Sequence, residues 1–329
     1  MSKDLLRLTV YLGERKRAGR RFAVDALLDR FERNAIATSI VLRGMAGFGH
    51  KHHLRTDASL SLSEDLPAVA IAVDTRARID AVVDDALAIA GDGLVTLEQA
   101  TLPADPPPTV KLSVHLGRQD RVDGRPAFVA LCELLQQHGV GGASALLGVD
   151  GTVGGTRERA RFLAGNAAVP MLLVAVGAGD RIAAARPAIA AAVPAAVCTE
   201  QPVWDEPDTS SAGTDLHRLT LYTAESQLHA GRPIHRAVLR ELRRSGASGA
   251  TTLRGVWGFH GEHPPHGDRL FTLGRHVPAV TVVVDTPDRI VTARAVVGRF
   301  TAEHGLVTVE PLLRLPRTPA PAARPRAAR

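Results

Sequence analysis

Two copies of one short motif are the residues of this 329-residue sequence best suited to bind a ligand. The first copy is Arg43-Gly-Met-Ala-Gly-Phe-Gly49, and the second is Arg254-Gly-Val-Trp-Gly-Phe-His260. An arginine presents a fork of N–H donors that fits phosphate, and glycines let a ligand approach the backbone closely. The motif therefore indicates an anion contact, although its spacing is neither a Walker A loop nor a dinucleotide fingerprint.

The same motif is also compatible with a purely structural turn, in which Arg43 pairs with a carboxylate such as Glu14 or Glu98. Glu14 recurs as Glu225 at the same offset that separates the two motifs, so both glutamates join the candidates. The candidate ligand-binding residues are Arg43, Gly44, Gly47, Phe48, Gly49, Glu14, Arg254, Gly255, Gly258, Phe259 and Glu225.

Histidines follow both motifs and suggest a metal site as an alternative. Only His52 and His263 occupy matching positions in the two copies. The sequence contains no His-Glu-x-x-His pattern and just two cysteines, Cys132 and Cys198, so the histidines are interpreted first as solvated loop residues. His52 and His263 remain the candidate metal ligands.

Catalysis has little support in the sequence. No Gly-x-Ser-x-Gly motif, Cys-His arrangement or recurring pair of carboxylates is present. Cys132 lies on the apolar face of a predicted helix together with Phe128, Leu131 and Leu135, which indicates a core residue and not a nucleophile. We therefore expect a protein that is not an enzyme.

The motif belongs to a much longer internal repeat. Leu8-Thr-Val-Tyr11 returns as Leu219-Thr-Leu-Tyr222, and Gly93 to Glu98 returns as Gly305 to Glu310. A third, middle copy begins at Leu112-Ser-Val-His115, but its segment Leu146-Leu-Gly-Val-Asp-Gly151 lacks the arginine and the phenylalanine. The middle copy is thus predicted to keep the fold and to lose the site, which leaves at most two strong ligand sites per chain.

Each copy is predicted to have the order strand, helix, strand, strand, helix, strand. In the first copy, hydrophobic periodicity predicts strands over 8–13, 37–42, 67–73 and 94–97, and helices over about 24–31 and 76–90. The motif would then begin where the second strand ends and enter a loop. Asp74-Thr75 is expected to cap the second helix, and Pro187 and Pro194 to shorten or kink its counterpart in the middle copy.

This order of elements predicts an α+β fold. Right-handed crossovers place two helices on one face of a four-stranded antiparallel sheet and leave the other face open. Three copies in one chain could cover these open faces with one another. We expect a monomer with an intrachain pseudo-threefold assembly, in which the sheets face a common axis and clefts lie between neighbouring units.

The predicted division of the chain follows the repeats and the proline-rich stretches between them. The segments are a first unit over 1–102, a linker over 103–109, a degenerate second unit over 110–203, a linker over 204–215, a third unit over 216–313, and a disordered basic tail over 314–329.

Four segments of the first unit resemble the DUF190 family of the PII-like (nitrogen regulatory protein PII/CutA) group. They are Tyr11-Leu-Gly-Glu14, Leu42 to Gly49, Leu62-Ser-Glu-Asp-Leu-Pro67 and Gly93 to Glu98. The third unit departs from the pattern at three places, namely Thr223-Ala224, His260 and Phe271 to Pro278.

The resemblance implies ferredoxin-like units that normally form a homotrimer, with an adenine nucleotide or a related effector bound between subunits. It also implies signalling through loops, here about 45–65 and 256–276, to a regulated partner such as a membrane transporter or channel. CutA relatives make copper or zinc binding the alternative, and a scaffold without a ligand is a third possibility.

Composition narrows the partners and the location. The net charge of +6 owes much to the basic tail, so no specific nucleic-acid partner is expected. The N-terminus carries charges where a signal peptide needs an apolar run, and no stretch is apolar enough to span a membrane. We expect a cytoplasmic protein.

Overall fold

The computed structural model describes most of the chain. The described residues are 4–49, 51–57, 65–102, 108–158, 169–207, 215–261, 265–267, 277–301, 305–313 and 315. Both predicted linkers lie partly outside this set, and the predicted tail lies outside it except for residue 315. The fold is mixed α+β, with one large antiparallel sheet and six helices in the described residues.

The three units contain the same elements in the same order. The first has β1 (Leu5–Gly13), α1 (Ala23–Arg33), β4 (Thr38–Phe48), β6 (Pro67–Thr75), α2 (Arg76–Ala90) and β7 (Leu94–Gln99). The second has β8 (Thr109–Gly117), α3 (Ala127–Gln137), β11 (Gly142–Leu147), β12 (Asp150–Val153), β14 (Pro170–Ala178), α4 (Gly179–Ala192) and β15 (Val197–Pro202). The third has β16 (His217–Ala224), α5 (Ile234–Arg244), β19 (Ala250–His260), β21 (Pro278–Asp285), α6 (Pro287–Thr301) and β22 (Leu306–Pro311).

Short hairpins decorate each unit. They are β2 (Arg17–Ala18) with β3 (Arg21–Phe22), β9 (Arg121–Val122) with β10 (Arg125–Pro126), and β17 (Leu228–His229) with β18 (Arg232–Pro233). Three further short strands, β5 (Arg55–Thr56), β13 (Thr156–Arg157) and β20 (His266–Gly267), pair with β4, β12 and β19, respectively.

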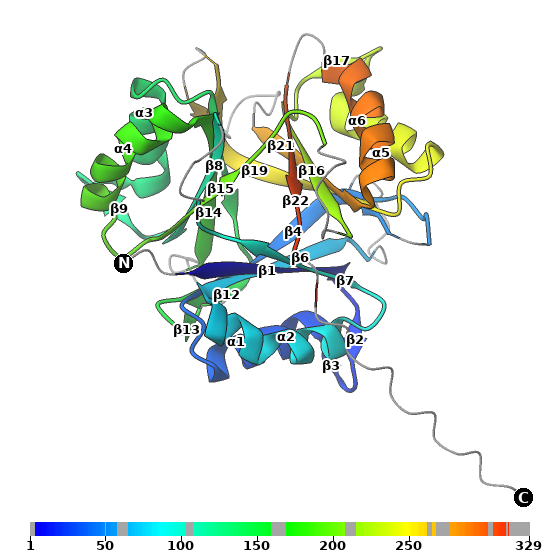
Figure 1. Ribbon diagram of the computed structural model, residues 1–329, viewed down its shortest axis with the longest axis horizontal. Helices are drawn as coiled ribbons and strands as arrows, with labels where there is room; N and C mark the ends of the chain where they lie inside the picture. The colour runs from blue at the N-terminus through cyan, green and yellow to red at the C-terminus, as the bar shows by residue number, and fades with distance from the viewer. Residues whose placement is uncertain are drawn as a thin grey trace, which may run out of the picture.

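Within each unit, the strands pair in one antiparallel order. The first unit runs β4-β6-β1-β7, the second β11-β14-β8-β15, and the third β19-β21-β16-β22. Two helices cover one face of each set, and the three helix pairs lie on the outside of the molecule (Figure 1). In the first unit, Leu27, Leu28 and Phe31 of α1 belong to one buried apolar core with Leu8 and Val10 of β1.

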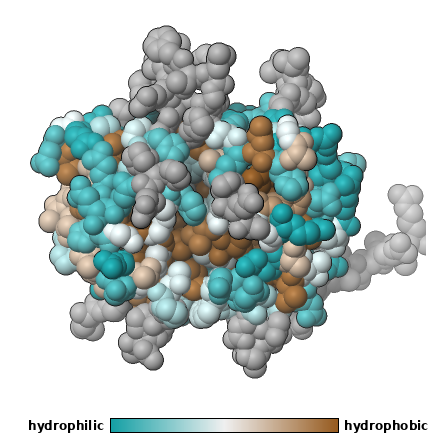
Figure 2. Space-filling view, turned by 90° about the horizontal axis from the view of Figure 1, so that it is seen from above, coloured by the Kyte–Doolittle hydropathy of each residue, from teal (hydrophilic) through white to brown (hydrophobic). Residues whose placement is uncertain are grey.

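The uncovered sheet faces meet in the middle of the molecule. A buried apolar cluster there combines side chains of all three units, including Ile71 of the first, Leu172 of the second and Val280 of the third. Figure 2 views the molecule from above, and on the surface seen there hydrophobic residues gather near the middle among hydrophilic ones. The open faces predicted from the sequence therefore cover one another.

Strands of neighbouring units pair with one another, and these pairings join the three sheets. The end of β4 pairs with the beginning of β19, the end of β19 pairs with β11, and β12 pairs with the beginning of β4. These pairings close a ring. The prediction that the second strand of the first unit stops at Leu42 is therefore wrong, because β4 continues through Arg43 to Phe48 and pairs with its neighbour.

Two smaller predictions concern the helix that follows the third strand of a unit. Thr75 makes no side-chain capping bond, and the Asp74 carboxylate instead accepts hydrogen bonds from the backbone N–H groups of Thr75 and Ala37. Pro187 lies inside α4, which ends at Ala192 and has 14 residues against 15 for α2, so the helix of the middle unit is shorter by one residue. None of the described helices is long and apolar enough to cross a membrane.

The motif glycines make this pairing between units possible. A Cβ atom on Gly47 would lie 2.5 Å from the carbonyl oxygen of Ala250, and one on Gly258 would lie 2.3 Å from that of Ala143. Gly151 of the middle unit faces Ser39 in the same way. A glycine at this position is therefore required by contact with the backbone of the next unit, and the middle unit retains it.

We expect Gly47→Ala to destabilise the protein by about 1–3 kcal/mol, because the new methyl group would push β19 away from β4. Gly49→Ala is the matched control, since none of the described residues lies within 4 Å of a Cβ built at Gly49. Urea unfolding followed by circular dichroism measures both variants. Equal stability of the two variants would contradict this role.

Candidate functional site

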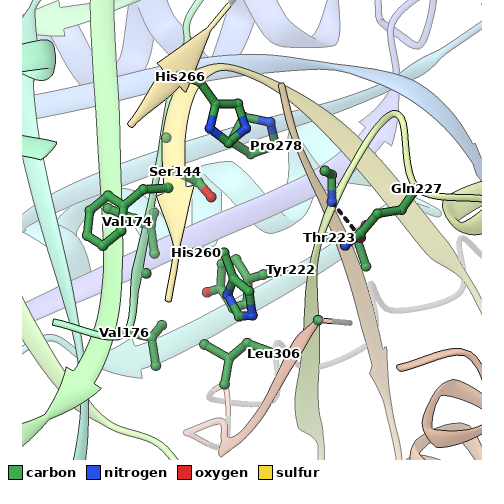
Figure 3. A pocket seen from close by; sticks show the side chains of 16 residues that line it. Ser144, Val174, Val176, Tyr222, Thr223, Gln227, His260, His266, Pro278 and Leu306 are labelled. Carbon is green, nitrogen blue, oxygen red and sulfur yellow. Dashed lines mark hydrogen bonds between the residues drawn. The ribbon is translucent and has the colours of Figure 1, made fainter. Parts of the chain in front are cut away.

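Two clefts lie at unit boundaries, and equivalent residues of the repeats form them. The 1/3 cleft, between the first and third units, has a volume of about 560 Å³. The 2/3 cleft, between the second and third units, measures about 70 Å³ and is shown in Figure 3. The pairs of equivalent lining residues include Tyr11 and Tyr222, Gly47 and Gly258, Phe48 and Phe259, and Pro67 and Pro278.

Cationic side chains distinguish the 1/3 cleft. Arg15, Lys16, Lys51 and Arg55 line it, and His53 adds a fifth nitrogen-bearing side chain. At the equivalent positions, the third unit has Ser226 for Arg15, Gln227 for Lys16 and His266 for Arg55, and the latter two line the 2/3 cleft. The larger cleft is thus the one suited to an anion.

The carboxylates of the 1/3 cleft already have partners. Arg55 donates to Asp65 at 2.6 Å, and Lys16 pairs with Asp92. Asp285 accepts hydrogen bonds from the backbone N–H groups of Ser248 and Thr286. Lys51 is exposed and has no carboxylate partner among the described residues. The cleft therefore keeps an excess of positive charge.

Local structure explains how the cations are placed. β1 ends at Gly13, and a turn carries Arg15 and Lys16 to the rim of the cleft. A Cβ atom on Gly13 would lie 2.3 Å from a carboxylate oxygen of Asp65, so a side chain there would displace that carboxylate. Asp65 in turn accepts from the backbone N–H of Arg15 at 2.6 Å, which holds the turn against the hairpin that carries Arg55.

The two motif arginines lie outside both clefts. Arg43 donates to Glu14 at 3.0 Å, and the two side chains are about half exposed. Arg254 forms a bidentate pair with Glu225, at 2.9 and 2.8 Å, and also contacts Asp57 at 2.9 Å. Each arginine thus joins the turn after the first strand of its unit to the motif strand.

The remaining motif residues divide between the clefts and the strand contacts. Gly47, Phe48 and Gly49 line the 1/3 cleft, and Gly258 and Phe259 line the 2/3 cleft. Gly44 and Gly255 pack against Pro67 and Pro278, at distances that leave little room for a side chain.

The boundary between the first and second units is built differently. The middle unit has Leu147 at the arginine position and Thr152 at the phenylalanine position, while Gly148 and Gly151 keep the glycine spacing. Arg157 of β13 binds Asp150 of its own unit and Asp25 and Asp29 of α1. An ion network thus ties the middle unit to the helix of the first.

The four cations of the 1/3 cleft are not among the ligand-binding residues predicted from the sequence. Arg15 and Lys16 belong to a basic run that immediately follows Tyr11-Leu-Gly-Glu14, and the third unit lacks this run. This difference between otherwise matching repeats could have indicated that the first unit binds an anion there. Lys51 and Arg55 lie among the histidines that drew attention to metals instead.

The described residues contain no group of three or more His, Cys, Asp and Glu side chains that could hold a metal. His52 stacks on Phe48, with ring centroids 6.0 Å apart, and His263 lies outside the described residues. Cys132 is fully buried, as expected for a core residue, and burial raises the pKa of its thiol to about 12.

Comparisons with known proteins place all three repeats in one family. The DUF190 family, described as "Uncharacterized ACR", matches residues 5–102, 109–204 and 216–313. The middle match confirms the third copy inferred from sequence register. A UPF0166 protein of Aquifex aeolicus (strain VF5) is 26% identical over 93 residues, which cover 28% of this chain and 86% of that protein.

Solved structures resemble the chain weakly. An aspartate kinase from Synechocystis is 9% identical with a TM-score of 0.26, over 94% of this chain and 43% of the kinase. An unknown protein from Galdieria sulphuraria is 11% identical with a TM-score of 0.20, over 62% of this chain and all of that protein. Such low scores carry no information about function.

His115 stands in the middle unit where the other units have Tyr11 and Tyr222. It is buried, and neither ring nitrogen has a hydrogen-bond partner among the described residues. Burial, reinforced by the charge of Arg7, lowers the pKa of His115 to about 3 from 6.5. The ring is therefore neutral in the folded protein at neutral pH.

Below pH 6.5 the unfolded chain binds a proton at His115 that the folded protein does not, so folding stability falls as the pH falls. We expect His115→Phe to remove this effect. Between pH 6.5 and about pH 5, the natural protein should lose about 2 kcal/mol more than the variant, because one pKa unit corresponds to about 1.4 kcal/mol. Urea unfolding across this range measures the difference, and parallel pH profiles would contradict the assignment.

Proposed function

This chain belongs to the DUF190 family, and we propose that it is a non-enzymatic regulatory protein that binds a small anionic effector in the 1/3 cleft. An adenine nucleotide is the specific effector proposed. The observation that carries the proposal is the gathering of Arg15, Lys16, Lys51 and Arg55 around a cleft of about 560 Å³. Pockets for small ligands typically measure about 300–1,000 Å³.

The proposal includes the architecture. Each unit is taken as ferredoxin-like, and the three units as a pseudo-threefold assembly that stands in for a trimer of separate chains. The shared strand order within units and the ring of strand pairings between them support this view. It explains why the ligand clefts should lie at unit boundaries.

The walls of the 1/3 cleft suit the two ends of a nucleotide. Tyr11, Phe48 and Leu94 contribute apolar surface on which a base could pack, and the cations could bind phosphate oxygens. Arg and Lys are the side chains that bind phosphate most strongly, and Arg55 lies on the hairpin beside the motif strand. A bound phosphate could therefore join the turn after β1 to this hairpin.

Such a ligand would act as a switch only if it prefers one arrangement of the hairpin. Lys51 and Arg55 lie in the first predicted signalling loop, whose residues 50 and 58–64 are outside the described residues. In the second loop, residues 262–264 and 268–276 are likewise outside them. We propose that occupancy of the cleft is passed through the first loop to a protein partner, such as a transporter or channel.

Isothermal titration calorimetry of the full chain with ATP, ADP, AMP and cyclic AMP tests the proposal. We expect one strong site per chain, because none of the described residues that line the 2/3 cleft is an arginine or a lysine. Lys16→Gln places the residue of the third unit in the 1/3 cleft and should weaken binding about tenfold or more. A charge-assisted hydrogen bond is worth roughly 1.5–3 kcal/mol, and about 1.4 kcal/mol corresponds to a factor of ten.

Arg43→Ala is the matched control, because it removes a cation of the same motif region that lies outside the cleft. Its affinity should equal that of the natural protein. Absence of heat with every nucleotide, or an equal loss in Arg43→Ala and Lys16→Gln, would contradict the proposed site. Titrations with Zn²⁺ and Cu²⁺ on the same samples measure metal binding separately.

A further inference from the structure

A layer of buried charged side chains crosses the centre of the molecule. Arg7, Lys111 and Arg218 occupy the same position in the first strands of the three units. Their neighbours across the sheet are Glu98 of the first unit, Gln201 of the second and Glu310 of the third. All six side chains are at least nine-tenths buried.

The charged pairs run from each unit to the next. Arg218 of the third unit donates two hydrogen bonds to Glu98 of the first, one of them at 2.8 Å. Lys111 of the second unit donates to Glu310 of the third. Arg7 of the first unit would complete this cycle by pairing with the second unit, but the residue there is the neutral Gln201.

Arg7 consequently lacks a carboxylate of its own. Its nearest carboxylate oxygen is on Glu98, 3.3 Å from Nε, and Glu98 is already bound by Arg218. The Arg7 Nε and the Gln201 Oε1 have no hydrogen-bond partner among the described residues. Three cations thus face two carboxylates in the buried layer.

Both carboxylates are ionised and Lys111 is charged at neutral pH. Burial alone would raise the pKa of Glu98, but Arg218 and Arg7 hold it at about 2. Burial and the charge of Arg218 lower the pKa of Lys111 to about 8, against the opposing effect of Glu310. The layer therefore carries one uncompensated positive charge, which is costly in a buried site.

A cavity of about 40 Å³ lies beside this charge. Its polar wall consists of Arg7, Lys111, Arg218, Thr9 and Thr220, and its other wall is the central apolar cluster. The hydroxyl of Thr9 is buried and has no partner among the described residues. The cavity is large enough for one water molecule or one small ion.

We propose that this central cavity binds one small inorganic anion of the size of a halide, held by Arg7, Lys111 and the Thr9 hydroxyl. The anion supplies the negative charge that a carboxylate in place of Gln201 would bring to the buried layer. The volume excludes a nucleotide and leaves room for a monatomic anion such as a halide. The site is separate from the 1/3 cleft, although Tyr11 and Val282 line both.

The test is urea unfolding of the full chain at neutral pH, with sodium chloride replaced stepwise by sodium gluconate at constant ionic strength. Gluconate is too large for the cavity. We expect the urea midpoint of the natural protein to rise with chloride, because a ligand that binds only the folded state stabilises it. Gln201→Glu supplies the missing carboxylate and should abolish this chloride dependence.

Gln137→Glu is the matched control, since it makes the same change of charge at an exposed position at the end of α3. It should keep the full chloride dependence. A direct measurement on the natural protein is the bromide anomalous signal in crystals grown with sodium bromide, expected in the cavity beside Arg7. No chloride-specific stabilisation of the natural protein, an unchanged dependence in Gln201→Glu, or no bromide peak in the cavity would overturn the proposal.

Discussion

The structure depends on backbone pairing between units. Each motif strand begins in its own sheet and ends against a strand of the next unit, and the middle unit does the same with β11 and β12. These hydrogen bonds are possible because glycines allow the backbones to approach closely. The ring they form brings the open sheet faces together and creates a cleft wherever a motif strand crosses a boundary.

Equivalent positions around this ring have taken on different chemistry. Lys16 and Arg55 border the 1/3 cleft, while Gln227 and His266 border the smaller 2/3 cleft. At the third boundary, Arg157 of the middle unit binds Asp25 and Asp29 of α1. The repeated backbone sets where a site can lie, and the side chains decide which boundary is suited to a ligand.

The order of elements, the three units and the covered sheet faces could be predicted because each rests on repeated hydrophobic patterns. The path of the motif could not, because the partner that extends β4 beyond Leu42 lies some two hundred residues away in sequence. For Arg43 the sequence left two interpretations open, a phosphate contact and a pair with a carboxylate such as Glu14, and the pair with Glu14 is the one that forms. Comparison of the aligned repeats, residue by residue, would have pointed to Lys16.

Because the three units belong to one polypeptide, their sequences can differ from one another. In a ring of three separate copies of one chain, replacing a buried glutamate by glutamine would remove all three carboxylates from the centre and leave three unbalanced cations. Here the replacement occurs once, at Gln201, while Glu98 and Glu310 remain. Because the three units are covalently linked, a substitution can affect one unit of the ring and leave the other two unchanged. Glutamine in place of a buried glutamate then leaves one unbalanced cation and not three.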